Sequence, residues 1–477
     1  MFHHVAQRPV GTGGTVIDHD LLRRTLEVAL GRGGDFAEVF VEDVRTSSAG
    51  FDDGRIEELV TGRDRGAGIR VVVGGGTGFA HTADLTDTGL AEAARVAAAA
   101  ARGAGPGGRT VGLDRSRRSD TVAVLDPADV PKARKVALLQ RADAAARAAG
   151  PAVVQVSARY GDARRRTVVA NSDGVVAESD RVTTSFSVGV VARGDTGLQT
   201  GRESLGRVAG FELFDDHDVA ELAERAAARA VRKLAARPAP SGSLPVVIAS
   251  GSGGILFHEA CGHGLEADLV AKGASVFAGR LGQQVASPLV TVVDDGTMTG
   301  EWGYLPLDDE GRPAARNVLI DGGVLTDYLY DLVRARQAGR AGTGNGRRQS
   351  YRHLPMVRMT NTYITAGTTD PADIVADTDH GVYVAQLGGG QVDTASGDFV
   401  FGMTEAYLIE GGRITEPIRD GNLIGNGPNA LAAIDAVGND FAMGSPGTCG
   451  KDGQGVPVGT GTPTLRVPAL TVGGTAA

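Results

Sequence analysis

The segment LPVVIASGSGGILFHEACGHGLEAD, residues 244–268, decides how this chain is organised. Its first seven residues are apolar enough to form a buried strand, the glycines at 251–254 indicate a loop, and the apolar residues that follow indicate the start of a helix. Residues 258–263 then place two imidazoles, a carboxylate and a thiol within less than two helical turns. We therefore expect the chemistry of the protein in this segment.

The spacing of the two histidines predicts an irregular helix. His258 and His263 are five residues apart. At about 100° per residue, positions i and i+5 of a regular α-helix diverge by roughly 140°, so the two rings would not converge on one ion. A π-type bulge or a helix break near Gly262 would turn His263 back toward His258. An undistorted helix with the rings pointing apart would contradict a metal site.

The residue types in this cluster favour a hydrolytic metal centre. Neutral imidazole is the commonest metal ligand, and a neighbouring carboxylate such as Glu259 can take a proton from a water activated by the ion. The alternative is that these polar side chains only decorate a helix surface. The segment is otherwise small and apolar, and an unpaired imidazole in a partly buried place is costly. A phosphate-binding loop is disfavoured, because GSGG at 251–254 matches neither Walker A nor G-x-G-x-x-G.

The chain has two cysteines, Cys261 and Cys449, and we expect both to be reduced. Cys261 lies two residues before His263, would point to another side of the helix, and is interpreted as a packing residue. Cys449 lies in GSPGTCGKDGQGVPVGTG, residues 444–461, whose glycines and prolines predict a loop. The nearby Lys451 would favour a metal-binding thiolate. The residues alone leave a ligand role and a buried, inert role for Cys449 equally open.

Three stretches together resemble the TldD branch of the TldD/PmbA family of metalloproteases. They are HEACGH at 258–263, SYRHLPMVRMTNTY at 350–363 and GTCGKDGQGVPVGTGTPTLRV at 447–467. The resemblance covers most of the chain. It implies that His258, His263 and Cys449 are metal ligands and that Glu259 is the general base or acid of an HExxxH metalloprotease. It also implies a heterodimer with a related subunit that lacks the histidine motif, and a role in trimming unstructured peptides.

The donor atoms indicate which metal ion the site prefers, and the composition of the whole chain excludes some classes of partner. Thiolate and imidazole favour one divalent ion, zinc, over magnesium or calcium. The net charge of −9 gives no electrostatic footprint for nucleic acid. The first residues, MFHHVAQRPVGTGG, have neither the basic start nor the apolar run of a secretory signal, and no stretch offers the ~20 apolar residues of a membrane span. We expect a cytoplasmic protein without nucleic-acid or membrane partners.

The pattern of apolar residues predicts an α+β protein in three units. These are an N-terminal α/β unit over 1–115, a middle α/β unit with a closing helix over 116–240, and a β-rich metallopeptidase domain over 241–477. Helix, strands, helix recurs in the first two units, which hints at duplication. The third unit is expected to be a sandwich or an open barrel with one metal-binding helix. The predicted helices cover 21–30, 85–101, 132–149 and 218–236, and the predicted linkers are RGAGPGG at 102–108 and RPAPSGS at 237–243.

The third unit contains further groups of polar residues outside the histidine and cysteine segments. The acidic groups Asp294-Asp295 and Asp308-Asp309-Glu310 are interpreted as turn formers. Tyr351, Arg352 and His353 are candidates for contacts with the substrate or the transition state, although an isolated histidine is more often a core residue. The preceding AGRAGTGNGRRQS, residues 338–350, is expected to be mobile, either gating the site or lying loosely on the surface.

These observations favour a metal-dependent peptidase that hydrolyses unfolded or extended peptides. In this hypothesis Glu259 activates a water bound to a metal ion on His258, His263 and Cys449, and an open sheet edge binds the peptide as an added strand. One alternative is a non-catalytic assembly subunit in which the metal only joins the Cys449 segment to the helix. Another is a metal-dependent amidase for a small molecule, and a third is a modulator that binds nucleic acid or a DNA-processing enzyme.

Overall fold

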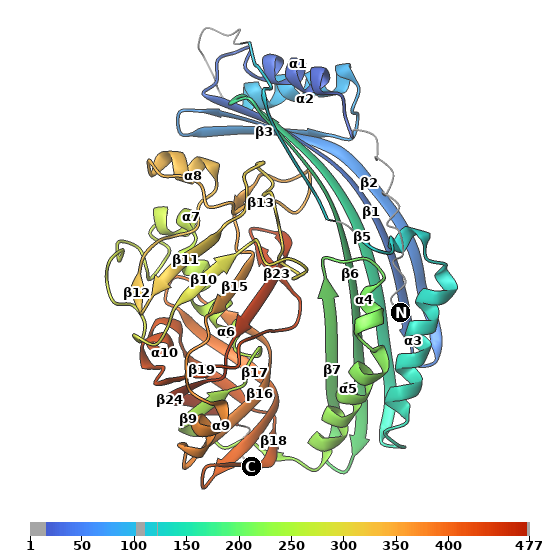
Figure 1. The fold of residues 1–477 in the computed structure, drawn as a ribbon, viewed down its shortest axis with the longest axis vertical. Coiled ribbons are helices and arrows are strands. Elements are labelled where there is room, and N and C mark those ends of the chain that lie inside the picture. The colour runs from blue at the N-terminus through green and yellow to red at the C-terminus, as the bar shows by residue number, and fades with distance from the viewer. Residues whose placement is uncertain (1–15, 102–109, 122, 475–477) are drawn as a thin grey trace, which may run out of the picture.

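A computed structural model describes residues 16–101, 110–121 and 123–474 of the chain. The fold is mixed α+β with a β-rich C-terminal region, as predicted (Figure 1). A long, curved sheet from the first half of the chain lies beside a more compact C-terminal half. No helix in the described ranges is long and apolar enough to cross a membrane. The predicted linker at 102–108 falls outside the described residues.

The first two predicted units share one seven-stranded sheet with the order β3-β2-β1-β5-β6-β4, in which β7 also pairs with β6. β1 and β5 join the units, because they pair from Glu38↔Asn171 to Asp52↔Ser157. The boundary near residue 115 remains a prediction, but the strands on its two sides hydrogen-bond into one sheet. The strands are β1 (Phe36–Asp52), β2 (Arg55–Val73), β3 (Gly76–Thr82), β4 (Arg115–Asp120), β5 (Val153–Asn171), β6 (Val175–Gly194) and β7 (Gly197–Arg207).

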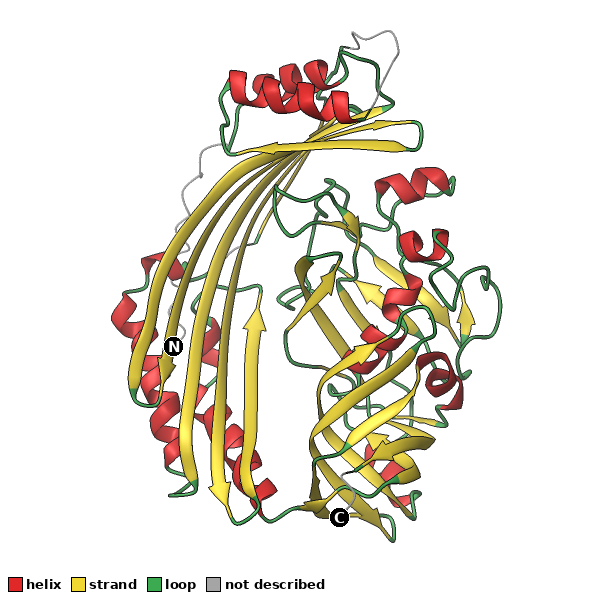
Figure 2. Ribbon diagram, turned by 180° about the vertical axis from the view of Figure 1, so that it is seen from behind, coloured by secondary structure: helices red, strands yellow, loops and turns green. Residues whose placement is uncertain are grey.

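Four long helices cover this sheet, close to where the sequence predicts them. α1 (His19–Ala29) and α2 (Asp87–Ala100) pack on one end of the sheet, and α3 (Lys132–Arg147) and α5 (Val219–Leu234) pack along the other (Figure 2). The Asp218 side chain accepts a hydrogen bond from the Ala220 backbone N–H and so caps the start of α5, where the predicted helix begins. Helix, strands, helix therefore occurs twice, and the duplication itself stays a prediction.

The C-terminal half contains two larger sheets rather than a simple sandwich or open barrel. The first has the order β12-β11-β10-β15-β23-β21, with β22 pairing to β23. The second closes on itself, because β16, β9, β24, β19 and β17 follow one another and β17 pairs again with β16. The closure leaves no free edge within this ring of strands. Part of the predicted linker at 237–243 also belongs to the second sheet, because β8 pairs with β18.

The bounds of these elements are as follows. The first sheet contains β10 (Val292–Asp295), β11 (Arg316–Asp321), β12 (Val324–Leu325), β15 (Asn361–Ile364), β21 (Ala442–Met443), β22 (Gly447–Lys451) and β23 (Gln454–Thr462). The second contains β8 (Arg237–Pro238), β9 (Gly242–Ile248), β16 (His380–Val392), β17 (Asp398–Glu410), β18 (Arg413–Arg419), β19 (Asn422–Asn426), β20 (Ala436–Val437) and β24 (Leu465–Gly473). The remaining elements are β13 (Gly346–Arg347), β14 (Met356–Val357), α4 (Leu213–Asp216), α6 (Gly254–Ala260), α7 (Ala267–Ala271), α8 (Leu332–Gln337), α9 (Pro371–Ala376), α10 (Gly427–Ala433), and the 3₁₀ turns η1 (Pro127–Asp129) and η2 (Gly262–Leu265).

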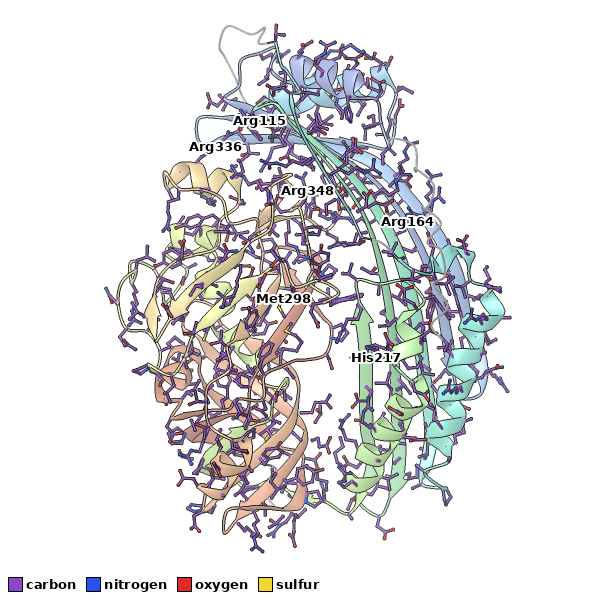
Figure 3. All side chains as sticks on the ribbon, viewed as in Figure 1. Arg115, Arg164, His217, Met298, Arg336 and Arg348 are labelled. Atoms are coloured by element: carbon purple, nitrogen blue, oxygen red, sulfur yellow. The ribbon has the colours of Figure 1, made fainter. Side chains whose placement is uncertain are left out.

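Buried ion pairs join the long sheet to the C-terminal half. Arg70 of β2 bonds to Glu38 at 2.9 Å and to Glu310 at 2.8 Å. Arg348 also bonds to Glu38, and it lies where the C-terminal half meets the sheet (Figure 3). These side chains are almost fully buried, so each charge depends on its partner.

This junction confirms one expectation from the sequence and corrects another. Asp308, Asp309 and Glu310 lie in a turn, as predicted, and Asp309 and Glu310 are also buried and pair with arginines of the long sheet. The stretch 338–350 is not loose throughout, because Asn345, Arg347 and Arg348 are buried and hydrogen-bonded. Local sequence could not show this burial, because several partners are distant in the chain, such as Arg70, 240 residues before Glu310, and Pro457, 110 residues after Arg347.

A glycine at this junction allows a first prediction. A Cβ atom on Gly68 of β2 would lie 2.4 Å from the backbone oxygen of Tyr351, which packs on the sheet from the C-terminal half. Gly68→Ala should therefore lower the free energy of unfolding by about 1–3 kcal/mol, because the two backbones must move apart. Gly75→Ala, where a Cβ meets nothing within 4 Å, is the control. Equal chemical denaturation midpoints for both variants would contradict the tight contact.

Candidate metal centre

The histidine segment contains the predicted helix break. α6 ends at Ala260, Cys261 leaves the helical conformation with φ −129° and ψ −43°, and the 3₁₀ turn η2 follows. The distortion is a break rather than a π-bulge. It brings the rings of His258 and His263 to a centroid distance of 5.3 Å with their planes at 80°. The rings therefore converge instead of pointing apart.

Two glycines of this segment are needed for close packing. A Cβ atom on Gly262 would lie 2.3 Å from the Sδ atom of Met359, and one on Gly254 would lie 2.5 Å from the backbone nitrogen of Gly461 on β23. Real side chains almost never make contacts this short. The glycines therefore let the metal segment press directly against the neighbouring sheet. The sequence predicted a different role for Gly262, that of allowing a bulge or break in the helix.

Cys449 lies on a strand and not in a loop, which corrects the sequence prediction. β22 and β23 form a hairpin whose two turn residues, Asp452 and Gly453, have φ of 48° and 74°. Such left-handed turns suit the twist of a two-residue hairpin, so the glycine-rich composition supports strand pairing here. Cys449 is buried, and its Sγ atom lies 3.3 Å from Nε2 of His263, a residue 186 positions earlier.

His258, His263 and Cys449 together form a set of donors that fits a metal ion. One ligand atom from each lies within 4.8 Å of the others. Both ring nitrogens of His258 are buried and have no hydrogen-bond partner among the described residues. An ion would supply the missing partner of that ring, which is otherwise costly to bury. Two imidazoles and a thiolate suit zinc, with a fourth position left open.

The two histidines also set the charge state of the thiol. Burial alone would raise the pKa of Cys449, but its interactions with the nearby rings of His258 and His263 outweigh burial and lower this pKa to about 4. Burial would lower the pKa of His263, but the neighbouring Glu266 and Cys449 raise it well above its usual value. Without an ion, the site thus favours a thiolate beside a protonated ring.

A layer of charged residues behind His263 was missed by the sequence analysis. The fully buried Glu266 carboxylate lies 3.0 Å from His263 Nδ1. Lys451 does not stabilise the thiolate directly, contrary to expectation. Its Nζ atom donates to Glu266 at 2.8 Å, to Asp268 at 2.7 Å and to the backbone oxygen of Val357 at 3.1 Å. The signal for this contact in the sequence was the spacing of three residues between His263 and Glu266.

Glu259 and Cys261 occupy the environments that their predicted roles require. The Glu259 side chain is 30% exposed, and its Oε2 atom lies 3.7 Å from His263 Nε2. A carboxylate in this position is next to the donor set and still reaches solvent. Cys261 is buried in the hydrophobic core, as predicted, and burial raises the pKa of its thiol.

The remaining candidates, Tyr351, Arg352 and His353, make other contacts. Tyr351 and Arg352 both bond to Asp64 on β2, the former at 3.3 Å, and thereby attach this loop to the long sheet. His353 Nδ1 lies 2.9 Å from the Ser350 hydroxyl. Within the described part of the chain, none of their hydrogen bonds or ion pairs reaches the metal ligands. Their contact with substrate stays a prediction.

Comparisons with known proteins agree with this architecture. Three family models match in order, described as PmbA/TldA metallopeptidase domain 1 at residues 37–101, central domain at 125–234 and C-terminal domain at 241–474. The matched domains therefore assign the fold to a metallopeptidase class. The chain belongs to the TldD/PmbA family.

Curated relatives share most of their length with this chain. A "Metalloprotease TldD homolog" of Haemophilus influenzae is 40% identical over 457 residues, which cover 93% of this chain and 94% of the relative. A "Zinc metalloprotease TldD homolog" of Saccharolobus solfataricus is 28% identical, with coverage of 93% and 97%. The family assignment thus applies to the whole described architecture.

Solved structures share the fold at lower identity. TldE from Thermococcus kodakarensis has a TM-score of 0.77 at 21% identity, covering 96% of this chain and all (100%) of its own. A protein from Thermotoga maritima described as a candidate modulator of a DNA gyrase has a TM-score of 0.79 at 23% identity, with coverage of 95% and 100%. At these identities the likeness shows the fold alone.

The charge states of the site predict how metal binding depends on pH. Ligands must lose their protons to bind, and at pH 7 His263 carries one while Cys449, with a pKa of about 4, does not. Binding should release about one proton per ion at pH 7, and the affinity should fall about tenfold per unit of decreasing pH. Calorimetry in buffers of different ionisation enthalpy measures this number. His380→Ala, at a 72% exposed side chain, is the control. Zinc binding at pH 7 without any release of protons would contradict the protonated His263 ring.

Proposed function

We propose that this protein is a metal-dependent peptidase that hydrolyses unfolded or extended peptides at the His258, His263 and Cys449 centre. The observation that carries the proposal is the meeting of these three buried donors, within 4.8 Å of one another, beside a carboxylate that reaches solvent. Metalloprotease names among the relatives support the same reaction class. Zinc is the proposed ion, from the donor set and from the name of one relative.

The proposed chemistry assigns one role to the ion and another to Glu259. A zinc ion at this site would polarise the scissile carbonyl and make water a stronger nucleophile at neutral pH. Glu259 accepts the proton of the attacking water and then delivers it to the leaving amine. His258 and His263, held on the two sides of the helix break, keep the donor atoms aimed at one point. A structural metal would not need Glu259 to be accessible, so its partial exposure favours catalysis over the assembly role.

We propose that the peptide binds as an added strand beside the cysteine hairpin. Among the described strands, β22 pairs only with β23, so its other edge is available. Thr448 and Gly450 on this edge are exposed and flank the buried Cys449. Main-chain hydrogen bonds along β22 would place a peptide bond next to the ligand sulfur, and such bonds select an extended conformation rather than a particular side chain.

The proposed setting is a cytoplasmic heterodimer with a related subunit that lacks the histidine motif. The shared fold with TldE supports a related partner, and the two free cysteines suit a reducing compartment. Light scattering on this chain, alone and mixed with a TldE-type protein of the same organism, should show a one-to-one complex. If light scattering shows that the mixed proteins remain separate, this assembly is contradicted.

A substitution at Glu259 tests the mechanism. Glu259→Gln should keep zinc bound, because the three ligands are unchanged, but should lower cleavage of an unfolded peptide by about 10²–10⁴-fold, because the proton acceptor is lost. Zinc content and peptide cleavage are measured on the same preparation. Glu92→Gln, at an exposed position of α2, is the control. Unchanged cleavage by Glu259→Gln would remove this residue from the mechanism.

A further inference from the structure

We propose that Glu266 and Lys451 are positioning residues that prepare the ligand set for its ion, an inference that rests on the proposed function. Glu266 orients the ring of His263, and Lys451 ties the cysteine hairpin to the same carboxylate. Both act through other residues, because neither belongs to the donor set. The observation behind this inference is the single oxygen, Oε2 of Glu266, that contacts both His263 and Lys451.

The contact with Glu266 selects the ring nitrogen that faces the ion. A carboxylate that already accepts from an ammonium also acts as an acceptor toward imidazole, so Nδ1 of His263 donates its hydrogen to Oε2 over 3.0 Å. The opposite nitrogen, Nε2, lies 3.3 Å from Cys449 Sγ, so this is the nitrogen that would give up its proton and bind an ion. A partner of this kind fixes the tautomer and the orientation of a metal-binding histidine.

The backbone around Glu266 is itself held in place. The N–H of Ala267 donates to the oxygen of Leu329 at 2.9 Å, and the N–H of Leu329 donates to the oxygen of Leu265 at 2.9 Å. Glu266 thus lies in a short parallel bridge with Leu329. This bridge holds the backbone from which the Glu266 side chain projects, and Lys451 holds the carboxylate itself.

Lys451 links the third ligand to this support. It lies two residues after Cys449 on β22, and alternate residues of a strand point to the same face. Its ammonium reaches back to Glu266 and Asp268, which follow the histidine segment in the chain. All three side chains are at most 9% exposed. Removing one partner of such a buried set is strongly unfavourable, so the hairpin stays in register with the histidines before any ion binds.

Asp268 provides a matched comparison. Its Oδ1 atom lies 2.7 Å from Lys451 Nζ, as close as Glu266, and among the described residues it makes no contact with a metal ligand. Asp268→Asn therefore weakens the fixation of Lys451 without touching His263. Glu266→Gln removes the charge from both contacts. The difference in zinc affinity between these two variants therefore measures how much the orientation of the His263 ring contributes.

The experiment measures zinc affinity by competition with a chelator, together with the visible absorption of the cobalt-loaded protein. Glu266→Gln and Lys451→Met should lower zinc affinity by about 10–100-fold and change the cobalt spectrum, since the ligand geometry loosens. Asp268→Asn should stay within about threefold of the wild type. Lys272→Met, at an exposed lysine, is the control for loss of charge. Thermal unfolding of the metal-free proteins shows which variants fold. If Glu266→Gln does not fold, Lys451→Met tests the positioning role instead.

The outcomes separate this inference from the proposed function. A wild-type chain that binds no zinc would overturn both. Tight zinc binding by the wild type, with equal affinity and an equal cobalt spectrum in Glu266→Gln and Lys451→Met, would overturn the positioning role and leave the proposed peptidase intact. A loss in Asp268→Asn as large as in Glu266→Gln would also overturn it, because the residues would then only hold the local fold together.

Discussion

The contact between a buried thiolate and two imidazoles is the constraint around which the C-terminal half is organised. Cys449 would not ionise in an apolar interior by itself, and His258 and His263 make the thiolate the favoured form. The two rings can only do so because the helix breaks at Cys261 and the chain returns on a hairpin from 186 residues away. The geometry needed for charge balance is the same geometry that offers three donors to one ion.

Further buried cations hold the hairpin and connect it to the long sheet. Arg358 donates to the backbone oxygens of Cys449 and Gln454, and Arg347 donates to that of Pro457 at 2.7 Å. The next residue, Arg348, pairs with Glu38 on β1. A buried guanidinium is expensive unless its donors are satisfied in a fixed arrangement. Residues 346–348 therefore connect the long sheet to the hairpin that contains Cys449.

Several local features of the chain were readable from the sequence for clear physical reasons. The four long helices follow from apolar periodicity and capping residues, as at Asp218. The break near Gly262 follows from the five-residue spacing of the histidines, which a regular helix cannot use for one ion. Cys261 as a core residue follows from its position two residues before His263, which points its side chain to another side of the helix. These inferences used only spacing and propensity within short stretches of chain.

Other features depend on partners that are distant in sequence. GSPGTCGKDGQGVPVGTG reads as a loop by composition and becomes a hairpin because its strands pair with each other and with β15. Asp309 and Glu310 read as turn residues, and only the structure shows that they are buried against arginines of the long sheet. Lys451 reads as a partner of the cysteine beside it and instead bonds to two carboxylates behind His263. The sequence by itself determined which donor groups the protein owns and how its helices begin and end, because spacing and local propensity act over a few residues. Only the tertiary structure decided which charges meet, because the cost of burying a charge is offset by whichever partner the folded chain brings within hydrogen-bonding distance.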